Sequence, residues 1–165
     1  MSRRSARTAP NGFSLVELMV VLFLMGLLAA AVVISQPGDE SKLSDEAGRL
    51  AARTSAARDL AITGATPVAL IVSDAGYYFE KRVAGQWQPL AEGRMAQTGW
   101  SKGTTATQDG AAVSATDPQL GSRSRIVFDS VGLASGDAAV RLQRGGRALT
   151  VRIARDGQVR VDAAQ

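Results

Sequence analysis

Three residues near the N-terminus have types and positions that suggest chemistry: Gly12, Phe13 and Glu17. Gly12 has no side chain and lies directly before a long apolar run, so a peptidase that cuts after it leaves that run on the mature chain. Glu17 places a carboxylate inside the run, where an ionised acid costs a few kcal/mol unless it is shallow or meets a cation. These residues indicate proteolytic processing and a functional role for Glu17.

The apolar run covers residues 13–34. About 20 residues of α-helix rise roughly 30 Å, which matches the hydrocarbon core of a bilayer, so we expect one transmembrane helix in contact with lipid. Arg3, Arg4 and Arg7 precede it and place the N-terminus in the cytoplasm by the positive-inside rule. In a bacterium, the expected location is then the inner membrane, with a single pass and a periplasmic C-terminal domain. Residues 1–12 are predicted to be a leader.

A second helical pattern follows a break at Pro37 and Gly38, where the proline ring and the glycine backbone oppose a continuing helix. Residues 35–63 are predicted to form an amphipathic helix that continues from the span, with regular periodicity from about Asp39 to Thr63. Its narrow stripe at spacings of three and four suits packing against a sheet. The predicted stripe contains Leu43, Ala47, Leu50, Thr54, Ala57 and Ala61.

Residues 64–165 have the short alternating runs and Gly/Asp turns of β-structure. We expect a hairpin near 67–83, with Trp87 as a packing residue beyond it. The polar stretch 92–122 is predicted to be long loops with one or two short strands. Further strands are expected at 125–128, 138–143, 148–154 and 158–161. The predicted fold class is α+β, with a long N-terminal helix followed by an antiparallel β-sandwich or meander.

The composition of the 165-residue chain contains no sign of an enzyme. It has no His and no Cys, which removes the commonest general base and several metal ligands, so we expect no catalytic residue, no metal and no cofactor. The formal charge of +4 falls to +1 without the three leader arginines, which weakens the case for nucleic-acid binding. Phosphate contact by the C-terminal arginines stays an alternative to solvated strand faces: Arg141, Arg144, Arg147, Arg152, Arg155 and Arg160.

The N-terminal block resembles that of type IV pilins and pseudopilins, in which Gly precedes the cut, Phe follows it and Glu is the fifth mature residue. Gly12, Phe13 and Glu17 match that pattern position by position. Further along, the chain resembles the GspH family, the H-type minor pseudopilins of type II secretion, and the related FimT-type minor pilins. The segments that carry this likeness are Leu50–Arg53, Ala56–Ala61, Gly64–Val68, Gly76–Phe79, Trp87–Leu90 and Val127–Gly132.

The resemblance implies a pilin-like fold and a minor pseudopilin function. A prepilin peptidase and N-methyltransferase would cut after Gly12 and methylate the amino group of Phe13. The protein would then enter the pseudopilus and help to export folded proteins across the outer membrane. Glu17 would act in assembly by pairing with the Phe13 ammonium of a neighbour. The implied partners are other major and minor pseudopilins and the inner-membrane secretion platform.

Two alternatives come from the same residues. The first is a FimT-type minor type IV pilin that acts in DNA uptake or pilus assembly, for which the arginine series is the support. The second is a periplasmic binding domain held by a signal anchor and unrelated to filaments. Nucleic acid is the less favoured ligand because no aromatic platforms lie near the arginines in the sequence.

Overall fold

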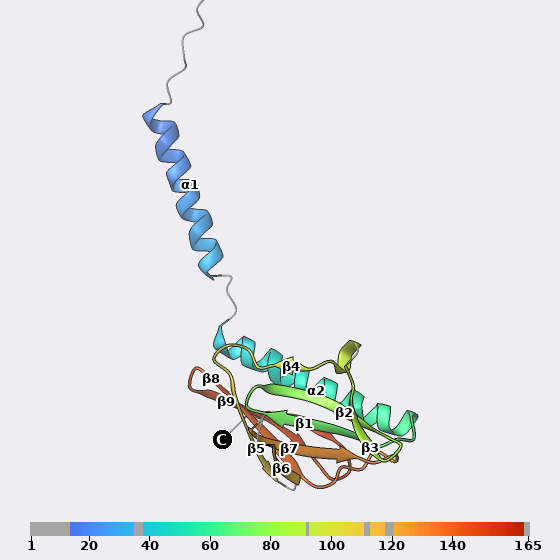
Figure 1. Cartoon of the computed structure of the whole chain (residues 1–165). Helices are drawn as coiled ribbons and strands as arrows, with labels where there is room; N and C mark the ends of the chain where they lie inside the picture. The colour runs from blue at the N-terminus through green and yellow to red at the C-terminus, as the bar shows by residue number, and fades with distance from the viewer. Residues whose placement is uncertain (1–13, 35–37, 92, 111–112, 118–120, 164–165) are drawn as a thin grey trace, which may run out of the picture. The chain divides into compact units, whose positions relative to one another are not determined.

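The computed structural model describes residues 14–34, 38–91, 93–110, 113–117 and 121–163 (Figure 1). The chain divides into two compact units, residues 1–37 and residues 38–165. The first unit contains helix α1, and the second contains helix α2 with all of the strands.

Helix α1 runs over Leu15–Ile34. It begins where the Ser14 carbonyl oxygen accepts hydrogen bonds from the backbone N–H groups of Glu17 (3.0 Å) and Leu18 (3.2 Å). The sequence between these ends lacks proline, so nothing in it interrupts the backbone ladder. Among the residues described, no helix combines the length and apolar character that a membrane crossing requires.

Helix α2 runs over Asp39–Thr63, the range that its periodicity predicts. Asp39 and Glu40 lie in the first turn, where carboxylates interact favourably with the free N–H groups of a helix start. At the other end, the Gly64 N–H donates to the Leu60 carbonyl (2.9 Å). The buried residues are the six predicted ones and one that was not predicted, Glu46: Leu43, Glu46, Ala47, Leu50, Thr54, Ala57 and Ala61.

The strands form two antiparallel sheets. In sheet A the order is β3-β2-β1-β7-β6, and β4 also pairs with β2. In sheet B the order is β10-β9-β8-β5. The members of sheet A are β1 (Val68–Ser73), β2 (Gly76–Val83), β3 (Gln86–Pro89), β4 (Thr98–Gly99), β6 (Val113–Asp117) and β7 (Gly121–Phe128), with the short 3-10 helix η1 (Gly93–Met95) between β3 and β4. The members of sheet B are β5 (Thr105–Gly110), β8 (Ala138–Arg144), β9 (Arg147–Ile153) and β10 (Val159–Ala163).

One hydrophobic core joins both sheets to α2. Helix α2 contacts β1 and β7 of sheet A and β8, β9 and β10 of sheet B, so its buried stripe lies against both (Figure 1). The predicted hairpin is β1–β2, with Leu70 opposite Phe79 and Val72 opposite Tyr77. All four side chains are buried. The core therefore depends on the alternation of these two strands as much as on the helix.

The prediction for residues 92–122 is wrong. The described part of this stretch contains β4, β5, β6 and the first residues of β7, and β5 is a full member of sheet B. Its register places Ala106 opposite Leu142 and Gln108 opposite Val140. The small, polar side chains of β5 gave no alternating pattern strong enough to predict a strand. Pairing with β8 supplies the hydrogen bonds and the buried neighbour that stabilise it.

The outer face of sheet A is covered by its own long side chains. The Arg125 guanidinium lies 5.1 Å from the Trp87 ring centroid, and the Arg82 guanidinium lies 5.9 Å from it. Arg125 also donates to the Glu80 carboxylate at 2.8 Å. Ala69 and Ile71 of β1 lie in register with Glu80 and Arg125 and are buried, so the central strand is covered on both faces. The prediction that Trp87 is a packing residue agrees with its half-buried place on β3, an outer strand of sheet A.

Candidate processing and assembly site

Glu17 lies in the first turn of α1 with an exposed side chain. A carboxylate in a first turn lies close to the backbone N–H groups that have no acceptor within the helix. Its backbone N–H is already bonded to the Ser14 carbonyl oxygen. The Glu17 side chain is thus exposed in this structure and accessible to a cationic partner.

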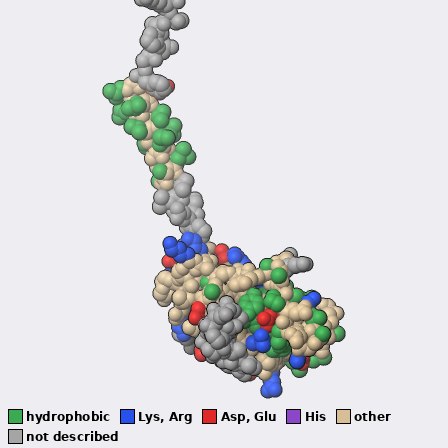
Figure 2. All heavy atoms as spheres, in the orientation of Figure 1, with side chains coloured by type: hydrophobic (Ala, Val, Ile, Leu, Met, Phe, Trp, Pro, Cys, Tyr) green, Lys and Arg blue, Asp and Glu red, His purple; other side chains and the backbone are tan. Residues whose placement is uncertain are grey.

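The rest of α1 presents large apolar side chains on all sides. Between Leu15 and Leu28 these side chains are 45–75% exposed. Figure 2 shows them along the helix as green spheres. A helix that is apolar all round is stable only where lipid or other apolar surfaces surround it. The exposed residues are Leu15, Val16, Leu18, Met19, Val20, Val21, Leu22, Phe23, Leu24, Met25, Leu27 and Leu28.

The other predicted site residues, Gly12 and Phe13, lie outside the described residues. The structure therefore places Glu17 alone of the three, and their juxtaposition stays a prediction. Helix α1 begins at Leu15, two residues after the predicted cleavage position.

A second set of polar residues, which the sequence analysis missed, lies on α2. Glu46 is only 7% exposed. Its Oε1 accepts the backbone N–H of Ser101, and its Oε2 accepts the Thr104 hydroxyl, both at 2.7 Å. We call residues 93–104 the α2 strap, because this segment is hydrogen-bonded to the helix at both of its ends.

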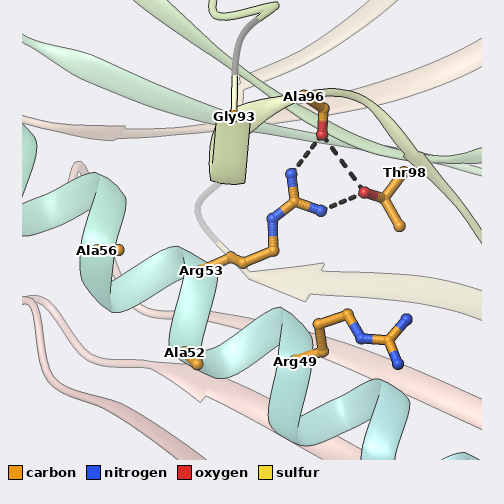
Figure 3. A pocket seen from close by; sticks show the side chains of 7 residues that line it. All are labelled: Arg49, Ala52, Arg53, Ala56, Gly93, Ala96 and Thr98. Carbon is orange, nitrogen blue, oxygen red and sulfur yellow. Dashed lines mark hydrogen bonds between the residues drawn. The ribbon is translucent and has the colours of Figure 1, made fainter.

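Arg53 holds the other end of the α2 strap. Its Nη2 donates to the Ala96 carbonyl, and its Nη1 donates to the Thr98 hydroxyl (Figure 3). The same Nη1 donates to the Tyr77 hydroxyl at 3.2 Å. The guanidinium also lies 4.9 Å from the Tyr77 ring centroid and 5.5 Å from that of Phe79. Beside it is an open hollow of about 410 Å³ that α2 and the strap line together. Arg53 therefore connects the helix, the strap and sheet A.

Two family models match this arrangement of an apolar helix followed by a helix packed on two sheets. The model described as "Type II transport protein GspH" matches residues 46–157, and the one described as "Prokaryotic N-terminal methylation motif" matches residues 7–33. The chain belongs to the GspH family. The methylation motif covers Gly12, Phe13 and Glu17, so the predicted site residues of this GspH-family chain lie within a motif of known type.

The named relatives agree with this family. Type II secretion system protein H of Aeromonas hydrophila is 34% identical over 88 residues, which cover 51% of this chain and 48% of that protein. The chain thus matches about half the length of this curated relative. The minor pseudopilin EpsH of Vibrio cholerae, described as part of the Type 2 Secretion System, superposes with a TM-score of 0.59 at 16% identity, covering 74% of this chain and 97% of that one.

A minor pilin has a similar fold. FimU of Pseudomonas aeruginosa, a type IV minor pilin, superposes with a TM-score of 0.51 at 16% identity, covering 74% of this chain and 98% of that one. At such identities the likeness concerns the fold alone. It confirms the predicted pilin-like α+β class of this GspH-family chain, in which an N-terminal helix precedes antiparallel sheets.

The sequence does contain a signal for the strap residues. Glu46 lies three residues after Leu43 and four before Leu50, and Arg53 lies three after Leu50, so both adjoin the buried stripe of α2. A charged residue at such a position needs a hydrogen-bonding partner, because an unpaired buried charge is costly. Helical spacing could thus have identified Glu46 as bonded, although it could not have named Ser101 and Thr104.

Three arginines of the series that supports the DNA alternative form ion pairs with acidic side chains. Arg144 donates to Asp39 at 2.8 Å, Arg147 donates to Glu40, and Arg152 donates to Asp162 at 2.9 Å. Nucleic-acid binding relies on phosphate neutralisation by free cations in a patch or stripe. These pairs interrupt the cationic surface of the GspH-family domain.

Proposed function

We propose that this protein is a minor pseudopilin subunit of the type II secretion pseudopilus, which helps to export folded proteins across the outer membrane. One observation carries the proposal: a prepilin-type methylation motif at residues 7–33 is followed in the same chain by a GspH-family domain at residues 46–157. In this role the protein is a filament building block and a substrate of processing, and it is not a catalyst.

Maturation is the first step of this proposal. A prepilin peptidase cuts the Gly12–Phe13 bond, and an N-methyltransferase activity methylates the new amino group of Phe13. The support is that the range matched by the methylation motif includes Gly12, Phe13 and Glu17. Residues 1–12 are then a leader that the mature subunit lacks.

The second step is retention in the membrane. We assign residues 13–34 to one inner-membrane span, with the N-terminus in the cytoplasm and residues 64–165 in the periplasm. This assignment rests on the sequence and on the family motif, because the described helices do not by themselves meet the requirements of a crossing. The exposed apolar surface of α1 supports it.

The third step is assembly with other pseudopilins on the inner-membrane secretion platform. The apolar surface of α1 packs among the helices of neighbouring subunits, and Glu17 accepts the Phe13 ammonium of one of them. A carboxylate surrounded by apolar groups is costly unless it is paired, so this contact lowers the cost for both charges. Glu17 thereby favours one register of the packed helices.

The test is mass spectrometry of the protein purified from cells with and without the prepilin peptidase. We expect a mature chain that begins at Phe13 with one added methyl group, and an intact precursor when the peptidase is absent. An intact, unmethylated N-terminus in peptidase-positive cells would contradict the proposal. That result would favour the signal-anchored binding domain.

A FimT-type minor pilin is the second candidate, supported by the likeness of the fold to FimU. The ion pairs of Arg144, Arg147 and Arg152 disfavour its DNA-uptake form. Duplex DNA titrated against the full chain in detergent at several salt concentrations distinguishes the two. Binding with a steep salt slope that Arg155→Ala and Arg160→Ala abolish would favour the minor pilin.

A further inference from the structure

A polar hollow lies at the end of sheet B where β8 turns into β9. Its volume is about 320 Å³. Three of its lining residues are arginines, and none is acidic, so an anion entering it meets positive charge and hydrogen-bond donors. The polar side chains that line it belong to Arg141, Arg144, Arg147, Gln143 and Thr105.

The arginines of this hollow keep donors for a ligand. The Nε of Arg141 has no hydrogen-bond partner but is inaccessible to water, so a ligand would meet this guanidinium through its Nη groups. Arg144 uses its Nε for Asp39 and its Nη1 for Thr104 (3.3 Å), and Arg147 uses its Nη1 for Glu40. A guanidinium carries further N–H donors on its remaining nitrogens. An anion can therefore bind without displacing the acidic partners.

The β8–β9 turn leaves the hollow open and fixes its position. Gly145 and Gly146 form the turn at φ values of +55° and +78°, the left-handed region that a two-residue hairpin turn of type I′ needs. A Cβ on Gly146 would meet nothing within 4 Å, so a ligand can approach on that side. A Cβ on Gly145 would lie 2.7 Å from the Asp39 carboxylate, which shows how closely the turn contacts the first turn of α2.

We propose that this hollow binds the phosphate group of an anionic lipid. Guanidinium groups match phosphate in charge and in hydrogen-bond geometry. The lipid source rests on the proposed membrane anchoring. The sequence allows only residues 35–37 between α1 and Gly38, and an extended chain covers about 3.5 Å per residue, so the start of α2 stays within roughly 15 Å of the end of the span. Arg144, which lines the hollow, is ion-paired with Asp39 at the start of α2.

Nucleic acid fits this site less well than a single lipid phosphate. A duplex needs several free cations along its backbone. On the same sheet, Arg152 is paired with Asp162 at 2.9 Å, and Arg160 donates to Gln158 at 2.5 Å. Three arginines converge on one hollow of about 320 Å³, which has the size of a headgroup site and lacks the extent of a duplex groove.

The experiment uses the full chain in nanodiscs of phosphatidylcholine, with or without phosphatidylglycerol. The natural chain has no Cys, so Ser44→Cys provides a single site for a donor dye on exposed α2, outside the hollow. Energy transfer to an acceptor on the lipid headgroups then reports how closely the domain approaches the membrane.

Arg141→Gln with Arg147→Gln is the test variant. Arg152→Gln with Arg160→Gln removes the same charge elsewhere on sheet B and is the control. Circular dichroism checks that each variant is folded.

We expect phosphatidylglycerol to increase the transfer, the test variant to lose this increase and the control to keep it. Arg141→Lys keeps the positive charge but lacks the paired donors of a guanidinium, so it should lose part of the phosphatidylglycerol-dependent increase in transfer. Equal losses in both double variants would overturn the site, because general charge would explain the binding. If phosphatidylglycerol has no effect but inorganic phosphate binds at Arg141, the ligand is a free phosphate and not a lipid. If duplex DNA binds in a salt-sensitive way and both double variants lose this binding, the ligand is nucleic acid. Failure of the chain to enter nanodiscs is a separate result, which would overturn the membrane anchoring and the lipid proposal with it.

Discussion

The two helices of this chain use apolar residues in opposite ways. In α1 the apolar side chains lie on every side, and Leu22, for example, is 60% exposed. In α2 they form one stripe that two sheets cover, and Leu50 is fully buried. The stripe of α2 is satisfied within its own unit, so α2 stabilises a domain. The apolar surface of α1 is not covered within its own unit, which is why we propose that lipid and other subunits surround it.

The largest expected effect concerns the proposed cleavage of the chain before α1. Gly12→Val should stop processing, because a side chain at this position obstructs the peptidase cleft next to the Gly12–Phe13 bond. The precursor should accumulate, as seen on a gel and by mass spectrometry. Gly38→Val is the matched control at a glycine outside the motif match. Normal processing of Gly12→Val would contradict the cleavage assignment.

Glu17→Ala tests whether α1 acts through its single charge. Removing the carboxylate makes the helix more apolar, so membrane insertion and cleavage should be kept. Crosslinking to partner pseudopilins and secretion should be lost, because the Phe13 ammonium of the neighbour loses its counter-ion. Glu17→Gln separates charge from shape. Normal assembly and secretion with Glu17→Ala would exclude a role for Glu17, and normal behaviour of Glu17→Gln alone would exclude a role for its charge.

The same truncation should have different effects in the two helices. Leu50→Ala removes a fully buried side chain and should lower the free energy of unfolding by about 2–5 kcal/mol. Leu22→Ala in α1 should leave that free energy unchanged, since the side chain is exposed in this structure. Urea unfolding of the full chain in detergent, followed by near-UV circular dichroism, measures both. Equal effects would mean that the two helices do not differ as proposed.

The polar contacts of α2 provide a smaller test. Glu46→Ala leaves the Ser101 N–H and the Thr104 hydroxyl without their acceptor and should destabilise the domain by roughly 1–3 kcal/mol. Hydrogen exchange should accelerate first in the α2 strap. Asp45→Ala is the control, because Asp45 is the neighbouring acid and is exposed. Unchanged exchange in residues 101–104 would show that Glu46 does not hold the strap.

The smallest expected effect is a pH dependence at the start of α2. The hydrogen bond from Arg144 holds the pKa of Asp39 below its ordinary value of 3.8, and the charges of Arg144 and Lys42 act in the same direction. Because the folded pKa is the lower one, the stabilisation is present above pH 3.8 and is lost as the pH falls through the folded value. Asp39→Asn should flatten this part of the stability curve. Parallel curves for the wild type and the variant would exclude the contribution.

Local patterns in the sequence predicted the helices and several of the strands. All six residues of the predicted α2 stripe are buried, because a period of 3.6 residues determines which side chains share a face. The β1–β2 hairpin and the C-terminal strands follow from alternation and turn residues in the same way. The residues at the N-terminus resemble the pilin motif in type and spacing, and the family match covers them.

Other features required the tertiary structure, because they join residues far apart in the chain. The pairing of β1 with β7 and of β5 with β8 joins strands far apart in the sequence, which local patterns do not specify. The bonds of Glu46 to residues 101 and 104, and of Asp39 to Arg144, follow from the same folding of the chain. The sequence by itself thus determined the local periodicity and the N-terminal motif. Only the tertiary structure decided the strand order, the strap and the polar hollow, since each needs side chains that the closing of long loops brings together.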